Sequence, residues 1–161
     1  MDYLPIFVNI KNQHCLIIGG GPVAARKADL FIKSGAIVTV IAPEIKTEMK
    51  HHLAHSKVVW QMDRFSEEVM AGLEKPKYVI SATDEQETNE AVYHYCKAHN
   101  IPVNVADQTE YCDFILPAIV DREPMTIAIS TGGRSPVLAR LMKARLETMI
   151  PTGFSKLADL V

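Results

Sequence analysis

The stretch from Cys15 to Ala28 constrains the fold more than any other part of this sequence, because three glycines separate an apolar run from a helical pattern. The run Cys15–Ile18 is short and apolar, which is typical of a buried strand. After the glycines, small and apolar residues recur at helical spacing as far as Phe31. The pattern predicts a strand, a tight turn and a helix.

The turn contains Gly19-x-Gly21-x-x-Ala24, the spacing of a dinucleotide-binding fingerprint. Gly19 permits the turn, Gly21 lets the backbone approach a pyrophosphate, and Ala24 lets the helix pack on the strand. The first helical turn, with Pro22 and Val23, then directs unpaired N–H groups at the phosphates. A plain strand-to-helix turn also favours glycine, so the flanking strand and helix are what favour the nucleotide interpretation.

The acidic partner of a nucleotide ribose is expected about 20 residues further on, where the second strand ends. That strand is predicted at Ala36–Ile41, and Pro43 and Glu44 follow it. Glu44 is a candidate for a hydrogen bond to the ribose. The alternative is that Glu44 only begins the next helix, where the macrodipole favours an acid. No arginine stands here to receive a 2′-phosphate, which favours NAD over NADP.

Composition narrows the class of protein. The chain has 161 residues, of which 48% are hydrophobic and 22% charged, as expected for a globular domain with a smaller appendage. A net charge of −2 argues against a general nucleic-acid binder. No apolar run is long enough to span a bilayer and the start is not basic, so no membrane association and a cytoplasmic location are expected. The three cysteines lack metal or disulfide spacing and are expected to be reduced.

Apolar strand-like runs alternate with helical segments as far as Ala106. Alternation of this kind predicts an α/β fold, a doubly wound, Rossmann-like parallel sheet with helices on both faces. Residues 1–113 are expected to form this NAD-binding domain. Strands are predicted at Cys15–Ile18, Ala36–Ile41, Lys57–Gln61, Tyr78–Ala82 and Ile101–Ala106, and helices at Pro22–Ser34, Glu44–His55, Ser66–Gly72 and from Asp84.

Ligands of such sheets bind beyond the carboxyl ends of the strands. Thr83 and Asp84 are candidates for cofactor contact there; the alternative is a helix cap, since Glu87 has capping-box spacing from Asp84. Asp107 follows the last strand and begins no evident helix. Its carboxylate is a candidate base that removes a proton while a hydride leaves to a nicotinamide. A solvated turn aspartate is the alternative.

The alternation stops after Asp107. Two apolar runs, Phe114–Val120 and Met125–Ser130, predict a hairpin, and a helix then begins with Ser135 as N-cap and Pro136 in the first helical position. From Ser130 to Leu146 there are four basic residues and no acidic one, which suits either a polyanionic substrate or a solvated helix face.

The histidines His51, His52 and His55 form the pattern HHxxH, and the first and last share a helix face. A catalytic zinc site would need a third ligand and usually a glutamate between the histidines. Neither is evident in the sequence, so no metal site is expected.

Several of these motifs together resemble the N-terminal module of siroheme synthase, in the order and spacing of that family. The Gly-rich fingerprint is shared by many families, whereas TGGRSPVLAR is the most specific block. The resemblance implies NAD-dependent oxidation of precorrin-2 to sirohydrochlorin, followed by insertion of ferrous iron to give siroheme, in a homodimer. The motifs are GGGPVAARKA, SATD, NVAD, FILPAIVDR and ISTGGRSPVLARLMKARLE.

Site residues follow from the resemblance by position. Asp107 aligns with the family's catalytic carboxylate, the base proposed for both steps. Gly19–Ala24 and Pro43–Glu44 match the nucleotide contacts. Thr131 stands where some members have a serine that can be phosphorylated. The acidic tetrapyrrole is expected to contact Thr131, Gly132, Gly133, Arg134 and Arg140.

The resemblance also implies how the rest of the chain is organised. Residues 114–147 are expected to form a small α+β dimerisation region, and residues 148–161 the start of a helical part that covers the substrate. In longer members a uroporphyrinogen methyltransferase domain follows. Two alternatives to the bifunctional enzyme stay open, namely a dehydrogenase without chelatase activity and a regulatory domain that binds NAD(H) without chemistry.

Overall fold

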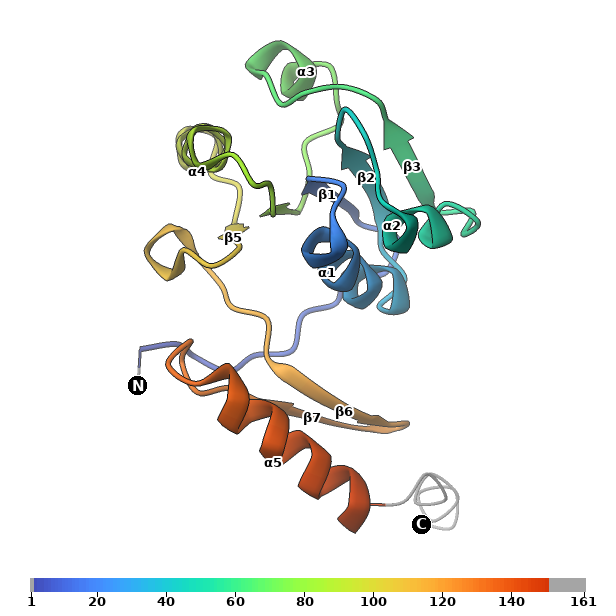
Figure 1. Cartoon of the computed structure of the whole chain (residues 1–161), viewed down its shortest axis with the longest axis vertical. Helices are drawn as coiled ribbons and strands as arrows, with labels where there is room; N and C mark the ends of the chain where they lie inside the picture. Colours follow the sequence, from blue (N-terminus) through green and yellow to red (C-terminus); the bar gives the residue numbers. More distant parts are fainter. Residues whose placement is uncertain (1, 151–161) are drawn as a thin grey trace. The chain divides into compact units, whose positions relative to one another are not determined.

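The structure is a computed structural model that describes residues 2–150 (Figure 1). The chain forms two compact units. The first is Pro5–Phe114, and the second combines Met1–Leu4 with Ile115–Val161.

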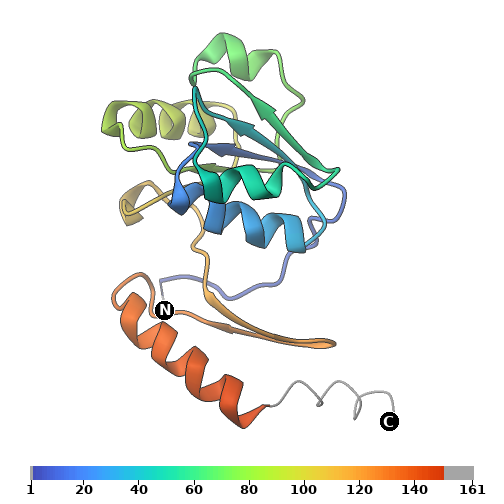
Figure 2. The ribbon, with the colours of Figure 1, turned by 45° about the vertical axis from the view of Figure 1, so that its right-hand side comes forward.

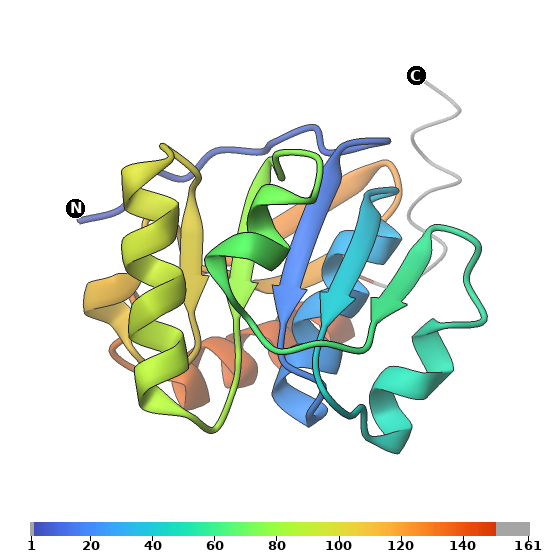
Figure 3. The same cartoon turned by 90° about the horizontal axis from the view of Figure 1, so that it is seen from above.

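The first unit is built on five parallel strands in the order β3-β2-β1-β4-β5. The predicted α/β fold with a doubly wound parallel sheet is confirmed. Because the chain runs from β1 to β2 in one direction and from β4 to β5 in the other, right-handed crossovers place α1 and α4 on opposite faces (Figure 3). The strands are β1 (His14–Ile18), β2 (Ile37–Ile41), β3 (Val58–Gln61), β4 (Tyr78–Ser81) and β5 (Val103–Val105). The helices are α1 (Pro22–Lys33), α2 (Thr47–His52), α3 (Glu67–Ala71) and α4 (Gln86–Ala98).

The strand register aligns the carboxyl ends of the central strands. Ile18 pairs with Ile41 on one side and with Ser81 on the other, and Ser81 pairs with Val105. The residues that follow therefore emerge together at one edge of the sheet. The central strands are buried on both faces, which explains their continuous apolar sequence.

The second unit is a hairpin with one helix (Figure 2). Strands β6 (Ala118–Arg122) and β7 (Met125–Ile129) pair antiparallel, and α5 (Pro136–Met149) contacts both. Ser135 caps α5 as predicted, because its Oγ accepts the Leu138 N–H at 3.3 Å. At the other end of the helix, Arg122 Nε donates to the Ile150 carbonyl at 2.8 Å.

Two predicted helix starts were wrong. Helix α2 begins at Thr47 and not at Glu44, because the preceding segment is held extended by a hydrogen bond from Lys46 N–H to the Gly20 carbonyl at 2.8 Å. Helix α4 begins at Gln86 with Glu85 in the N-cap position, so Asp84 does not cap it. Among the described residues, no helix has the length and apolar character needed to cross a bilayer.

Candidate functional site

Gly19 and Gly20, the first two of the three consecutive glycines, are required by contacts with the protein's own backbone. Gly19 has φ of +120°, and a Cβ placed on it would lie 2.3 Å from the Ala82 carbonyl oxygen, just beyond β4. A Cβ on Gly20 would lie 2.1 Å from the Glu44 carbonyl oxygen and 2.9 Å from the Ile45 Cα. The turn after β1 therefore packs directly on the segments that follow β4 and β2, at the point where the strand order reverses.

Gly21 differs from both neighbours. Within residues 2–150, and apart from Gly21 itself, its chain neighbours and the adjoining helix backbone, no atom lies within 4 Å of a Cβ built on it. Gly21 is the N-cap of α1, with Pro22 beginning the helix and Ala24 fully buried where the helix packs on the sheet. The open space above Gly21 suits a ligand that approaches the first-turn N–H groups of α1, as a pyrophosphate would.

A cavity of about 630 Å³ lies between the start of α1 and the segment that follows β2. Glu44 lies on its wall with an exposed side chain, and Lys46 Nζ donates to Glu44 Oε1 at 2.6 Å. This hydrogen bond holds the pKa of Glu44 below its ordinary value, so the side chain is an ionised acceptor at neutral pH. The lining residues are Pro22, Glu44, Ile45, Lys46, Thr47, Glu48 and Lys50.

The loop after β4 is fixed by Asn89, a buried residue of α4. Its Oδ1 accepts from Ser81 Oγ at 2.7 Å and from Thr83 Oγ1 at 2.9 Å, and its Nδ2 donates to the Thr83 carbonyl at 3.1 Å. Thr83 is thereby held half-buried at the sheet edge, whereas Asp84 is exposed. Asn89 is not among the residues predicted from the sequence, because its partners Ser81 and Thr83 are brought to it only by the packing of α4 on β4.

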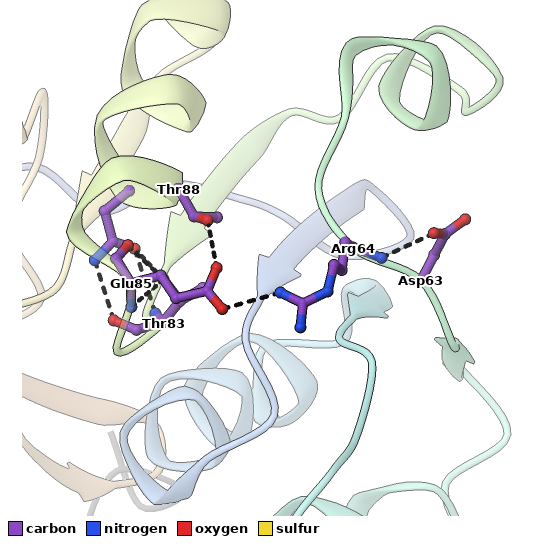
Figure 4. Close-up of polar contacts among 6 residues, drawn as sticks. Asp63, Arg64, Thr83, Glu85 and Thr88 are labelled. Carbon is purple, nitrogen blue, oxygen red and sulfur yellow. Dashed lines mark hydrogen bonds and ion pairs between the residues drawn. The ribbon is translucent and has the colours of Figure 1, made fainter.

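An ion pair joins the segments that follow β3 and β4 (Figure 4). Arg64 Nη1 lies 2.9 Å from Glu85 Oε1, and Thr88 Oγ1 donates to Glu85 Oε2 at 2.8 Å. The Thr88 hydroxyl and the Arg64 charge hold the pKa of Glu85 below its ordinary value. Both charged side chains are well exposed, so the pair contributes little to stability.

Asp107 lies beyond β5 with an exposed side chain and φ of +61°, in the left-handed region. An aspartate in this conformation costs about 1 kcal/mol, so the surrounding loop has to hold it. Ala106 N–H donates to the Ser81 carbonyl at 2.8 Å and continues the β4–β5 pairing up to Asp107. A short 3-10 helix, η1 (Thr109–Tyr111), follows, which the sequence analysis did not predict.

The first unit thus brings one group of candidates to a single sheet edge. That group is Gly19, Gly21, Pro22, Val23, Ala24, Pro43, Glu44, Thr83, Asp84 and Asp107.

The remaining candidates belong to the second unit. Thr131 Oγ1 accepts the Ser135 N–H at 3.0 Å, and Gly132 N–H donates to Ser130 Oγ at 3.0 Å. The Gly132 N–H therefore already has a partner within its own turn. Arg134 and Arg140 are exposed, and Arg134 lies 3.4 Å from Asp2 Oδ2.

The HHxxH histidines are separated by the end of α2. His52 Nε2 lies 3.1 Å from the Ala25 carbonyl, whereas His51 and His55 are exposed. Across residues 2–150, no group of three His, Cys, Asp or Glu side chains is placed to hold a metal ion.

The sheet order, the glycine turn and the cavity beside it define a nucleotide-binding protein of the Rossmann type. Residues 6–118 match the family described as "Putative NAD(P)-binding", and the chain belongs to that family. Residues 122–149 match "Sirohaem biosynthesis protein central". The predicted nicotinamide dinucleotide cofactor agrees with the family match.

The chain is similar to curated siroheme synthases. It is 72% identical to that of Hydrogenovibrio crunogenus over 161 residues, which is 100% of this chain and 34% of the relative. It is 49% identical to that of Nitrosococcus oceani over 159 residues, covering 99% of this chain and 33% of the relative. The resemblance inferred from the motifs is confirmed, and the chain spans about a third of the length of these relatives.

A solved structure extends the comparison to the fold. That of SirC, precorrin-2 dehydrogenase, matches with a TM-score of 0.80 and 26% identity, over 98% of this chain and 76% of that chain.

Proposed function

We propose that this chain carries out the NAD-dependent dehydrogenation of precorrin-2 to sirohydrochlorin in siroheme biosynthesis. One observation carries the proposal: the open first turn of α1 at Gly21 and the exposed carboxylate of Asp107 belong to the same edge of one sheet. The names of the similar siroheme synthases and of SirC supply the substrate.

In this proposal the nucleotide is held by the glycine turn and its neighbours. Gly21 and the first-turn N–H groups of α1, around Val23 and Ala24, receive the pyrophosphate. Glu44, with Pro43 beside it, accepts a hydrogen bond from a ribose hydroxyl. Thr83 and Asp84 contact the cofactor where β4 ends.

Asp107 acts as the base in this proposal. NAD bound at the glycine turn would supply the acceptor for a hydride from a tetrapyrrole carbon, and the Asp107 carboxylate takes the proton that the substrate loses with it. Charge and atoms balance, because the substrate loses one hydride and one proton. An exposed side chain on a left-handed turn is accessible to a bulky macrocycle.

The second unit is proposed to serve the substrate and the dimer. The carboxylates of the tetrapyrrole suit Arg134 and Arg140, with Thr131, Gly132 and Gly133 in the turn beside them. Residues 114–147 form the homodimer contact in this proposal, which is supported by exposed apolar side chains along α5, at Val137, Leu138, Leu141 and Met142.

The organisation of the whole protein is proposed from its relatives. Residues 1–113 form the NAD-binding domain, and residues 148–161 begin a helical part over the substrate; of these, 151–161 lie outside the described residues. A methyltransferase domain then follows in the cytoplasmic protein, consistent with the length of the relatives.

A second activity, insertion of ferrous iron into sirohydrochlorin, is proposed for the same site. The nitrogens of the macrocycle supply the iron ligands, so the reaction needs from the protein a base for the pyrrole protons. Asp107 is that base. The alternatives are a dehydrogenase that stops at sirohydrochlorin and an NAD(H)-sensing domain without chemistry.

The test is an absorbance assay with precorrin-2, NAD and ferrous iron on the full-length protein. Asp107→Ala is expected to abolish turnover and to leave NADH binding unchanged, while Asp29→Ala, a partly exposed α1 carboxylate paired with Lys33, leaves both unchanged. Retained turnover in Asp107→Ala refutes the role of Asp107. A spectrum that halts at sirohydrochlorin excludes chelation, and NADH binding without any turnover favours the sensing domain.

A further inference from the structure

A buried polar network lies beneath the loop that carries Asp107. Lys27 extends from α1 across one face of the sheet, and its Nζ donates to Asn104 Oδ1 at 2.8 Å. Asn104 is the central residue of β5 and is 4% exposed. Its Nδ2 donates to the Phe114 carbonyl at 2.9 Å and to Cys112 Sγ at 3.4 Å. The network therefore joins α1 to the far end of the loop.

The Cys112 thiol connects the two ends of this loop. Its sulfur accepts the Val105 N–H at 3.3 Å, and it lies 3.2 Å from the Val105 carbonyl and 3.3 Å from the Gln108 carbonyl, either of which accepts the thiol proton. Burial is the main cause that raises the pKa of Cys112, so the thiol keeps its proton and donates at neutral pH. Asp107 lies between the two backbone groups that the sulfur holds.

Lys27 is an unusual residue for this position, because burial of an ammonium is costly unless it is compensated. Burial is the main cause that lowers the pKa of Lys27, and the Asp107 carboxylate acts in the opposite direction. The Asn104 side-chain oxygen, 2.8 Å from Lys27 Nζ, is the hydrogen-bond acceptor that compensates this ammonium.

We propose that Lys27 and Cys112 are positioning residues that hold the loop 106–112 so that Asp107 keeps its place at the sheet edge. The proposal rests on the proposed function for the role of Asp107. Neither residue touches the reacting atoms in this proposal. Lys27 acts through Asn104, and Cys112 acts through the backbone of Val105 and Gln108.

The first measurement is amide hydrogen exchange of the full-length protein, which needs no turnover. In Lys27→Met and in Cys112→Ala, exchange of the Gln108 and Asp113 amides is expected to be at least about tenfold faster than in the unsubstituted protein. Arg26→Met, an exposed neighbour on the same helix, is the control and leaves exchange unchanged. Unchanged exchange in both variants overturns the proposal.

The second measurement separates positioning from binding. Both variants are expected to lower kcat for precorrin-2 oxidation by about tenfold or more while the NADH dissociation constant stays within about twofold. Cys112→Ser replaces the thiol by a hydroxyl, which also donates and accepts hydrogen bonds. Compared with Cys112→Ala, it is expected to restore most of kcat and most of the amide protection against exchange. A faster-exchanging loop with full kcat overturns the proposal. If the unsubstituted protein does not oxidise precorrin-2, the proposed function fails, and the exchange data still decide the positioning role.

Discussion

Substitution of the two adjacent glycines Gly20 and Gly21 by alanine separates stability from nucleotide binding. In Gly20→Ala the new methyl group would lie 2.1 Å from the Glu44 carbonyl oxygen and 2.9 Å from the Ile45 Cα. Both neighbours are backbone atoms, so a rotamer change cannot relieve the clash. We expect the upper end of the usual cost of overpacking, about 3 kcal/mol, and a fall in Tm of about 10 °C.

Gly21→Ala is the matched control, because the same methyl group meets open space among the described residues. Gly21 has φ of −86°, which alanine adopts without strain, so the free energy of unfolding is expected to change by less than about 0.5 kcal/mol. The methyl group does occupy the space assigned to the pyrophosphate. NAD affinity is therefore expected to fall at least about tenfold, equivalent to about 1.4 kcal/mol.

The assay combines urea denaturation with a calorimetric titration of NADH for both variants. The expected result is a destabilised Gly20→Ala protein and a stable Gly21→Ala protein that binds NADH weakly. Equal stability of the two variants would refute the account of Gly20. Unchanged NADH affinity in Gly21→Ala would refute the placement of the pyrophosphate over the start of α1.

Two further predictions concern stability. Asn89→Ala leaves the Ser81 hydroxyl without its buried acceptor and is expected to lower the free energy of unfolding, measured by urea denaturation, by about 2 kcal/mol. Arg64→Ala removes only an exposed ion pair and is expected to lower it by less than about 0.5 kcal/mol. Equal losses in the two variants would contradict this ranking. Burial raises the pKa of Cys15 from its ordinary 9.0 to about 11, so the unfolded chain loses the thiol proton first and stability falls as pH rises through this interval. Cys15→Ala should show a shallower decline in the free energy of unfolding above pH 9, and an identical slope would refute the assignment.

The parts of the fold that sequence predicted best are those that depend on local chemistry. Ser66 and Gly72 bound α3, and Ser135 with Pro136 begins α5, as predicted, because caps act within one helical turn. The start of α2 was wrong because it depends on a contact with Gly20, which is distant in sequence. At α4 neither capping candidate, Thr83 or Asp84, is the N-cap, because Glu85 takes that position and the Thr83 hydroxyl is bonded to the buried Asn89.

The candidate site shows the same difference between residues that a local pattern identifies and residues that depend on distant contacts. The fingerprint spacing identified Gly19 and Gly21 because their pattern is local, whereas Gly20 became significant only when β2 and β4 were placed beside β1. Asn104 interrupts an apolar strand, so the sequence alone indicates a buried polar group at that position. Its hydrogen-bond partner Lys27 is 77 residues away in sequence and could not be identified in the same way. Polar residues at inward positions of predicted strands are therefore a useful guide to buried networks, although they do not identify the partner.

The segment that carries Asp107 is closed at its base by Asp113. The Asp113 carboxylate accepts the Val103 N–H at 3.1 Å and pairs with Lys97 at 2.7 Å, and its own N–H donates to the Val103 carbonyl at 2.8 Å. Because the two ends of this stretch meet on the same strand, exchanges at its exposed positions leave the strand pairing unchanged. Thr109 and Glu110 are exposed in this stretch, so their side chains can vary among descendants while the parallel sheet stays intact.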